Sequence, residues 1–122
     1  MTTCLLASHL PIFGPMAKGL LERLGFEVVL ATDGKDALAE FEQQIPEAVL
    51  ITDGLPPFTT EQTIRAMREA EGGNVPKILV VVRLDSLDRI PQVRGAGAND
   101  CSAAPTMENL ERMLRRNGLL KS

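Results

Sequence analysis

The chain has 122 residues, of which 44% are hydrophobic and 24% are charged, and it carries a net charge of −3. These values predict one globular domain, residues 1–122, and exclude a disordered chain. The acidic balance gives no electrostatic reason to bind nucleic acid, and no apolar run is long enough to cross a membrane, so neither partner is expected. The N-terminus lacks the pattern of a signal peptide, which favours a cytoplasmic protein of bacterial type.

Short apolar runs and amphipathic stretches alternate five times along the chain. The apolar runs predict strands at Thr3–Ala7, Phe26–Ala31, Ala48–Asp53, Ile78–Val82 and Asp100–Ala103. Repeated strand–helix–strand units with short connections form a parallel sheet that has helices on both faces. Five such units in this length predict an α/β fold of the flavodoxin-like type, with the strand order 2-1-3-4-5.

The first predicted helix spans Pro15–Leu24. Pro15 suits the first position of a helix, and Gly25 suits the position just after its end. One face of this helix is apolar and is expected to face the core: Met16, Ala17, Leu20, Leu21 and Leu24.

Capping residues mark three further helices. Asp33 is the expected N-cap of the second helix, and Thr59 forms a capping box with Gln62 in the third. Thr106 caps the last helix, which Gly118 closes. The apolar residues predicted to face inward are Ala37, Leu38, Phe41, Ile45, Ile64, Met67, Leu110, Met113 and Leu114.

The fourth helix is the least regular part of the pattern. Ser86 is a candidate cap, but Pro91 follows only a few residues later. A proline in a helix interior removes a hydrogen bond and clashes with the preceding turn. We therefore expect this helix to be short, to start late or to be kinked.

The two cysteines, Cys4 and Cys101, both lie inside predicted strands. There is no Cys-x-x-Cys pair and no secretory signal, so we expect buried free thiols in a reducing compartment.

Asp53 ends the third predicted strand and precedes a turn rich in glycine and proline. In open α/β sheets, ligands bind beyond the carboxyl ends of the strands. Asp53 is therefore the leading candidate for a functional residue.

Four short motifs occur in order along nearly the whole chain. They are Gly25–Val28, Ala31–Leu38, Asp53 with Pro57 four residues later, and Ala96–Asp100 leading to Ala104-Pro105. Together they resemble the receiver domain of two-component response regulators, the CheY-like family. The resemblance implies a flavodoxin-like fold and places the phosphate-accepting aspartate of the family at Asp53.

In that family a histidine kinase supplies the phosphoryl group, and a divalent cation neutralises its charge during transfer. Mg²⁺ prefers carboxylates and other hard oxygen ligands. The resemblance implies an acidic pair after the first strand, but Ser8 and His9 stand there. A serine hydroxyl is a poor ligand for Mg²⁺, and histidine prefers softer metals.

Three other positions depart from the pattern that the resemblance implies. The switch hydroxyl after the fourth strand falls on Val81 or Val82, a register that the sequence leaves open. The lysine that contacts the phosphoryl group is replaced by Ala104, and the switch aromatic by Cys101. Each lost group of this kind costs on the order of 3–4 kcal/mol of transition-state stabilisation.

We therefore expect a degenerate receiver, or pseudo-receiver. It would not be an enzyme, would need no cofactor, and would act in signal transduction by binding signalling proteins such as a histidine kinase or an output protein. The alternative is a working receiver that is phosphorylated on Asp53 and uses Mg²⁺. An enzyme or nucleotide binder with the same fold is disfavoured because no glycine-rich phosphate loop follows the first strand.

The resemblance also implies a surface for partners or for a homodimer, formed by the fourth helix, the fifth strand and the fifth helix. The residues expected on this surface are Arg89, Gln92, Arg94, Cys101 and the 112–116 region.

Simpler structural roles compete with the functional ones. The Asp53 carboxylate is expected to accept backbone N–H bonds in the Asp-Gly turn. His9, the single histidine, is expected to bond to nearby backbone or to Asp53, and the latter contact would make a pH-sensitive pocket. The resemblance implies a cis peptide at Ala104-Pro105. For Leu119 and Leu120 three alternatives are open: they pack on the body of the domain, they fray, or they dock on a partner.

Overall fold

The computed structural model describes residues 2–103 and 106–120. Five parallel strands form one sheet in the order β2-β1-β3-β4-β5, which confirms the predicted topology. The strands are β1 (Thr2–Ala7), β2 (Phe26–Ala31), β3 (Ala48–Thr52), β4 (Lys77–Val82) and β5 (Asp100–Ala103). Within the described residues, no helix is long and apolar enough to cross a membrane.

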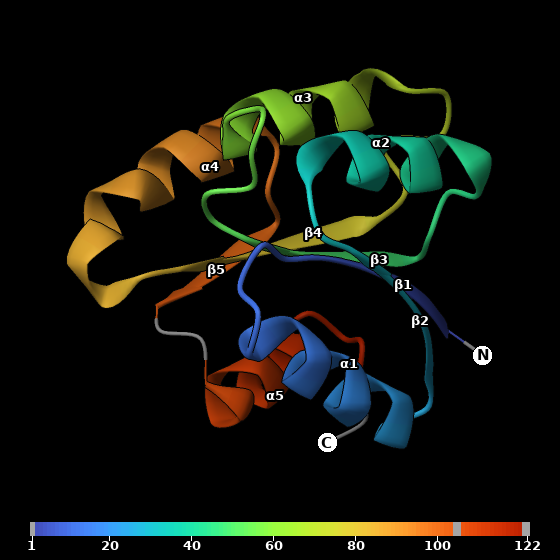
Figure 1. Ribbon diagram of the computed structural model, residues 1–122, viewed down its shortest axis with the longest axis vertical. Coiled ribbons are helices and arrows are strands. Elements are labelled where there is room, and N and C mark those ends of the chain that lie inside the picture. The colour runs from blue at the N-terminus through green and yellow to red at the C-terminus, as the bar shows by residue number, and fades with distance from the viewer. Residues whose placement is uncertain (1, 104–105, 121–122) are drawn as a thin grey trace.

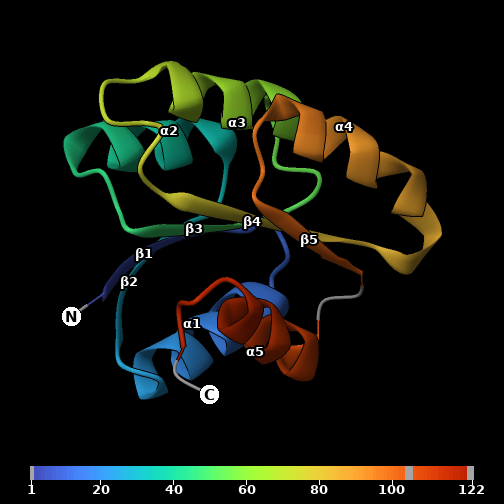
Figure 2. The ribbon, with the colours of Figure 1, turned by 180° about the vertical axis from the view of Figure 1, so that it is seen from behind.

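The helices cover both faces of the sheet. They are α1 (Phe13–Arg23), α2 (Gly34–Gln43), α3 (Thr60–Glu69), α4 (Ile90–Ala96) and α5 (Met107–Arg116), with a 3-10 helix, η1 (Leu84–Arg89), before α4. Helices α2, α3 and α4 lie on one face, whereas α1 and α5 lie on the other (Figure 1), and the view from behind shows the same three layers (Figure 2). Each face has its own buried apolar cluster.

The first helix begins two residues earlier than predicted, at Phe13. Pro15 is therefore the third residue of α1, where a missing N–H still costs nothing, because the first-turn amides have no partner within the helix. The buried stripe runs through Phe13, Ala17 and Leu20, and Leu21 extends it. The prediction that Met16 faces the core is wrong, because Met16 lies beside this stripe and is 54% exposed.

The predicted caps are confirmed. The Asp33 carboxylate accepts a hydrogen bond from the Asp36 amide, and the Thr106 hydroxyl accepts one from the Asn109 amide. Thr59 and Gln62 form the reciprocal capping box at the start of α3. These side chains satisfy amides that the first turn of a helix leaves without partners, so they fix where α2, α3 and α5 begin.

The fourth helix is short and starts late, as predicted. Residues 84–89 form the 3-10 helix, and α4 begins only at Ile90, with Pro91 in its first turn. Ser86 is not a cap, which corrects the prediction. It lies inside η1 with non-helical angles of φ −133° and ψ 34°, and its hydroxyl donates to its neighbour Asp85.

Arg68 at the end of α3 ties together the connections that lead into β4 and β5. Its guanidinium donates to the carbonyl oxygens of Gly97, Gly73 and Pro76 and to Asn99 Oδ1, at 2.8–3.0 Å. Gly97 has a φ of +126°, and a side chain there would collide with Arg68. Both features fix the turn that leads from α4 into β5.

Cys4 and Cys101 are buried free thiols, as predicted. Leu119 and Leu120 pack against the cluster on the α1 and α5 face, so the packed alternative holds for this segment. The described part of the chain has a cis peptide at Pro56-Pro57. The peptide predicted to be cis, Ala104-Pro105, lies outside the described residues.

Candidate functional site

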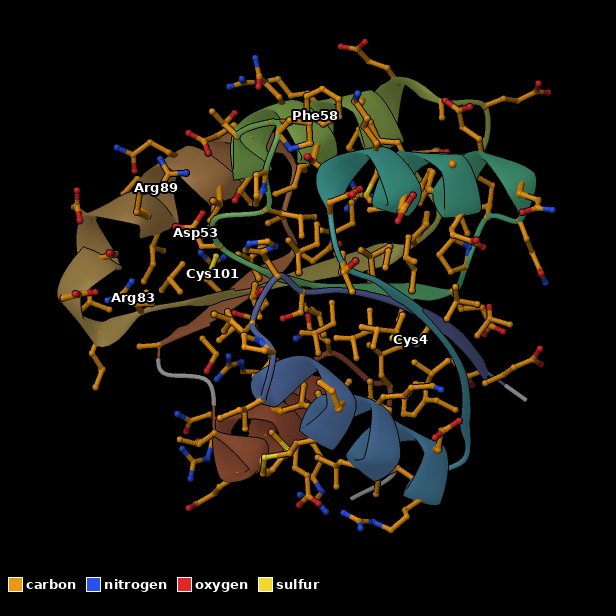
Figure 3. The ribbon with its side chains drawn as sticks, in the orientation of Figure 1. Cys4, Asp53, Phe58, Arg83, Arg89 and Cys101 are labelled. Carbon is orange, nitrogen blue, oxygen red and sulfur yellow. The ribbon has the colours of Figure 1, made fainter. Side chains whose placement is uncertain are left out.

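Asp53 lies at the carboxyl edge of the sheet, directly after β3. Its backbone N–H donates to the Val81 carbonyl at 2.9 Å, which extends the pairing of β3 with β4 by one residue. Its side chain is 13% exposed and points toward the start of α4 (Figure 3).

The Asp53 carboxylate is held by two side chains. The Thr60 hydroxyl donates to Oδ1 at 2.6 Å, and the Arg89 guanidinium donates from Nε to Oδ2 at 3.1 Å and from Nη2 to Oδ1 at 3.3 Å. The Gly54 amide donates to Thr60 Oγ1 at 3.1 Å. The sequence interpretation assigned the carboxylate to backbone amides of the turn. The Gly54 amide does help to lower the pKa of Asp53, but the hydrogen bonds from Arg89 and Thr60 contribute more.

Arg89 also binds a second carboxylate, Glu61, in the first turn of α3. Arg89 Nη1 donates to Glu61 Oε2 at 2.9 Å, and Nη2 donates to Oε1. One guanidinium therefore bridges Asp53 and Glu61. We call these three residues the Arg89 cluster.

The electrostatics of the Arg89 cluster favour the charged form of each member. Burial acts to raise the pKa of Asp53, but hydrogen bonds from Arg89 and Thr60 outweigh it, and the pKa lies below its ordinary value. The hydrogen bond from Arg89 also lowers the pKa of Glu61. The two carboxylates in turn raise the pKa of Arg89.

A hollow of about 370 Å³ opens beside the Arg89 cluster. Its lining residues come from the β3–α3 connection, the start of α3 and the segment around η1: Asp53, Gly54, Thr59, Thr60, Arg83, Ser86 and Arg89.

Ser8 and His9, the predicted replacements for the acidic pair, line a different hollow, next to Thr32 and Asp33. Ser8 is buried, and its hydroxyl oxygen accepts a hydrogen bond from Thr52 Oγ1 at 3.0 Å and one from the Leu10 amide. His9 Nδ1 lies 3.3 Å from the Thr32 carbonyl oxygen, so the histidine is engaged by backbone as predicted and not by Asp53.

The two valines considered for the switch hydroxyl point to opposite faces of the sheet. Val82, the last residue of β4, belongs to the core cluster under α2, α3 and α4, together with Cys101. Val81 belongs to the cluster under α1 and α5. Burial raises the pKa of the Cys101 thiol. Ala104, which stands where the resemblance implies a lysine, lies outside the described residues.

The surface predicted for partners is held together by Asp100 at the start of β5. Its carboxylate is 9% exposed and accepts hydrogen bonds from Arg94 on α4 at 3.1 Å and from Arg116 on α5 at 2.7 Å. Two residues predicted on this surface do not lie on it. Arg89 donates a hydrogen bond to Asp53, and Cys101 is buried in the core.

The sequence interpretation did not include Thr60 or Glu61, and it placed Arg89 on the partner surface instead of beside Asp53. A usable signal existed, because the carboxyl ends of β3 and β4 meet at one edge of a parallel sheet. Charged residues in the connections that follow these two strands are therefore expected to pair. What the sequence does not specify is the start of α4, and that start decides where Arg89 lies.

Comparison with known proteins places the chain among signalling domains. No protein-family model matches the sequence. It is 32% identical over 104 residues to the sensory transduction protein RegX3 of Mycobacterium tuberculosis, covering 81% of this chain and 44% of that protein. It is 29% identical over 118 residues to the transcriptional regulatory protein TrcR of the same species, covering 96% of this chain and 44% of that protein. The chain thus spans less than half the length of these curated relatives.

Solved structures share the whole fold. The receiver domain of the sensor histidine kinase PA1611 from Pseudomonas aeruginosa, crystallised with a magnesium ion in its active-site cleft, is 28% identical with a TM-score of 0.84, over 94% of this chain and 95% of that one. The chemotaxis response regulator CheY4 of Vibrio cholerae superposes with a TM-score of 0.88 at 23% identity, over 95% of this chain and 98% of that one. The chain is a receiver domain of the response-regulator, CheY-like type.

Acid is expected to destabilise this domain as its carboxylates gain protons. The pKa values of Asp53, Glu61 and Asp100 in the folded state lie below their ordinary values. The stability that these groups contribute is therefore present above their unfolded pKa values, near about pH 4, and is lost as the pH falls through the folded values. Urea unfolding measured from about pH 7 down to about pH 3 should show a flat region followed by a fall.

The matched control is Arg89→Met, which removes the main cause of two of these three shifts. Its stability should fall less steeply with acid than that of the wild type. An identical pH slope in both proteins would show that the Arg89 cluster does not hold these pKa values down.

Proposed function

We propose that this receiver domain acts by binding other proteins and does not use Mg²⁺-dependent phosphorylation of Asp53. The observation that carries the proposal is the Arg89 guanidinium, which engages both oxygens of the Asp53 carboxylate. An aspartate that attacks a phosphoryl group needs a free oxygen, and a fixed hydrogen-bonded cation restrains it.

The donor set around Asp53 supports the proposal, because it does not suit Mg²⁺. Among the described residues, no group of three or more His, Cys, Asp and Glu side chains is arranged to hold a metal ion. Asp53 and Glu61 already share one guanidinium, and Ser8 and His9 line another hollow. A dication beside Asp53 would be repelled by Arg89 and would find few hard oxygen ligands.

Residues at the end of β4 and in β5 support the proposal as well. Both candidates for the switch hydroxyl are buried valines, and Cys101 is buried in the same core cluster as Val82. A phosphoryl group on Asp53 would thus lack the hydroxyl that the family uses to draw the β4–α4 connection inward.

The partners would be cytoplasmic signalling proteins, such as a histidine kinase or an output protein, and the domain itself would not be catalytic. The polar surface of α4, β5 and α5 suits such contacts, because Gln92 and Arg112 are exposed there. Arg94 and Arg116 remain about half exposed while they pair with Asp100. A homodimer through this surface belongs to the same proposal.

The test is incubation with a small phosphodonor and Mg²⁺, followed by intact mass measurement. We expect no mass gain under conditions in which a Mg²⁺-dependent receiver, used as a positive control, is fully modified. If the chain does gain a stable phosphoryl group, and Asp53→Asn abolishes the gain, then the alternative function, a working phosphoacceptor, is correct.

A further inference from the structure

The segment just before α4 is attached to the domain in an unusual way. Residues 84–89 form η1, and none of their side chains is buried. Leu84 and Leu87 are 68% and 47% exposed, although both are apolar. Such a segment gains almost nothing from hydrophobic burial, so other interactions must hold it in place.

The hydrogen bonds within η1 are almost all local. Asp85 accepts from Arg83 and Ser86, and the Ser86 amide donates to the Arg83 carbonyl. Apart from the Asp85 contact with the adjacent Arg83, the hydrogen bonds that side chains of residues 84–89 make to the rest of the described chain start from Arg89 and end on Asp53 and Glu61.

The segment that follows is anchored differently. Val93 and Ala96 of α4 are buried in the core cluster, and Ile90 packs against that cluster. Loss of the Arg89 contacts would therefore free residues 84–89 without detaching α4.

We propose that the Arg89 cluster is an ionic latch that fixes residues 84–89 on the carboxyl edge of the sheet, and that loss of charge on any of its three members opens it. The Arg89 guanidinium lies between Asp53, which follows β3, and Glu61, in the first turn of α3. Figure 3 shows Arg89 extending from this segment toward Asp53.

The latch gives the domain two states of one exposed segment. In the closed state, Leu84 and Leu87 are presented in a single arrangement beside the hollow. In the open state the same residues are disordered, and a partner that binds them must first order them, which weakens binding. This regulatory role rests on the proposed function, whereas the latch itself depends only on the contacts of Arg89.

Hydrogen–deuterium exchange on the whole chain tests the latch. In Arg89→Met, amides of residues 84–90 should exchange roughly ten- to a hundredfold faster than in the wild type, because charge-assisted hydrogen bonds that hold the segment are lost. Amides of β1, β3 and β4 should be unchanged. Arg83→Met is the matched control. Arg83 lines the same hollow, but its ion pair among the described residues is with the nearby Asp85 and not with the β3 or α3 side of the site, so exchange in this variant should stay near that of the wild type.

Equal exchange of residues 84–90 in Arg89→Met and wild type would overturn the latch, whatever the phosphodonor experiment shows. If Arg89→Met exchanges faster throughout the chain, the whole domain is destabilised and this variant does not test the latch. Exchange is then measured in Glu61→Gln, which changes one charge in the first turn of α3. Selective faster exchange of residues 84–90 in Glu61→Gln supports the latch, and unchanged exchange there overturns it.

Discussion

The triple variant Ser8→Asp, His9→Asp, Arg89→Met is expected to bind Mg²⁺ on the order of a hundredfold more tightly than the wild-type chain. Its substitutions add two carboxylates and remove the cation that holds Asp53. The register supports the geometry, because Ala7 pairs with Ile51, so residues 8 and 9 follow β1 at the edge where Asp53 follows β3. Ser8 already contacts Thr52, the neighbour of Asp53.

Coulomb energies explain the expected size. Two unit charges about 4 Å apart interact by about 4 kcal/mol at an effective dielectric constant of about 20. If solvent screening and desolvation cancel half of that energy, about 2 kcal/mol remains for each of the three altered charges. A hundredfold change needs only about 2.8 kcal/mol, because every 1.4 kcal/mol is about tenfold in affinity. Calorimetric titration with MgCl₂ measures the difference directly.

Two controls separate the contributions of the new acids and of Arg89. The double variant Ser8→Asp, His9→Asp keeps Arg89 and should gain less affinity than the triple variant. Adding Asp53→Asn to the triple variant should remove most of the gain. If the triple variant binds Mg²⁺ no better than the wild type, then the identity of these residues is not what makes the site unsuited to the ion.

The strands and most helix starts follow from local sequence signals, and the structure shows why. The caps at Asp33, Thr59 and Thr106 bond to amides three residues later, so their effect does not depend on the tertiary fold. The run Ile78–Val82 is buried on both faces of the sheet, and a continuous apolar run carries that information directly.

The Arg89 cluster was not predicted because it depends on a tertiary detail. Whether Arg89 reaches Asp53 is decided by the 3-10 turns of η1 and by the late start of α4 at Ile90. Pro91 made an irregular helix predictable, but it did not specify in which direction the preceding residues turn. The family pattern drew attention to Ser8, His9 and the valines, none of which offers Asp53 a side-chain hydrogen bond in the described residues.

The same dependence on tertiary contacts applies to Asp100. The sequence placed Asp100 correctly at the start of β5. Its partners, Arg94 on α4 and Arg116 on α5, are brought to it only by the packing of these helices on the sheet. Because one buried carboxylate joins three elements, it connects the surface proposed for partner binding to the sheet.

The largest loss of stability is expected in the double variant Arg94→Met, Arg116→Met. Removing both cations leaves the Asp100 carboxylate, whose side chain is 9% exposed, without an opposite charge. Breaking a buried ion pair by removing the partner of the buried charge costs about 3–5 kcal/mol. The Cys101 amide and Asn117 still donate to Asp100, so the lower part of this range is expected. Urea unfolding near neutral pH measures the loss.

The opposite change should cost less, although it removes more hydrogen bonds. Asp100→Ala leaves Arg94 and Arg116, which are 50% and 52% exposed and can be hydrated where they stand. We therefore expect about 1–2 kcal/mol. The matched control, Arg112→Met with Arg115→Met, breaks only surface pairs within α5 and should cost less than about 1 kcal/mol. If Asp100→Ala is the more damaging change, the carboxylate acts chiefly by packing and hydrogen bonding, and its charge is already compensated by solvent.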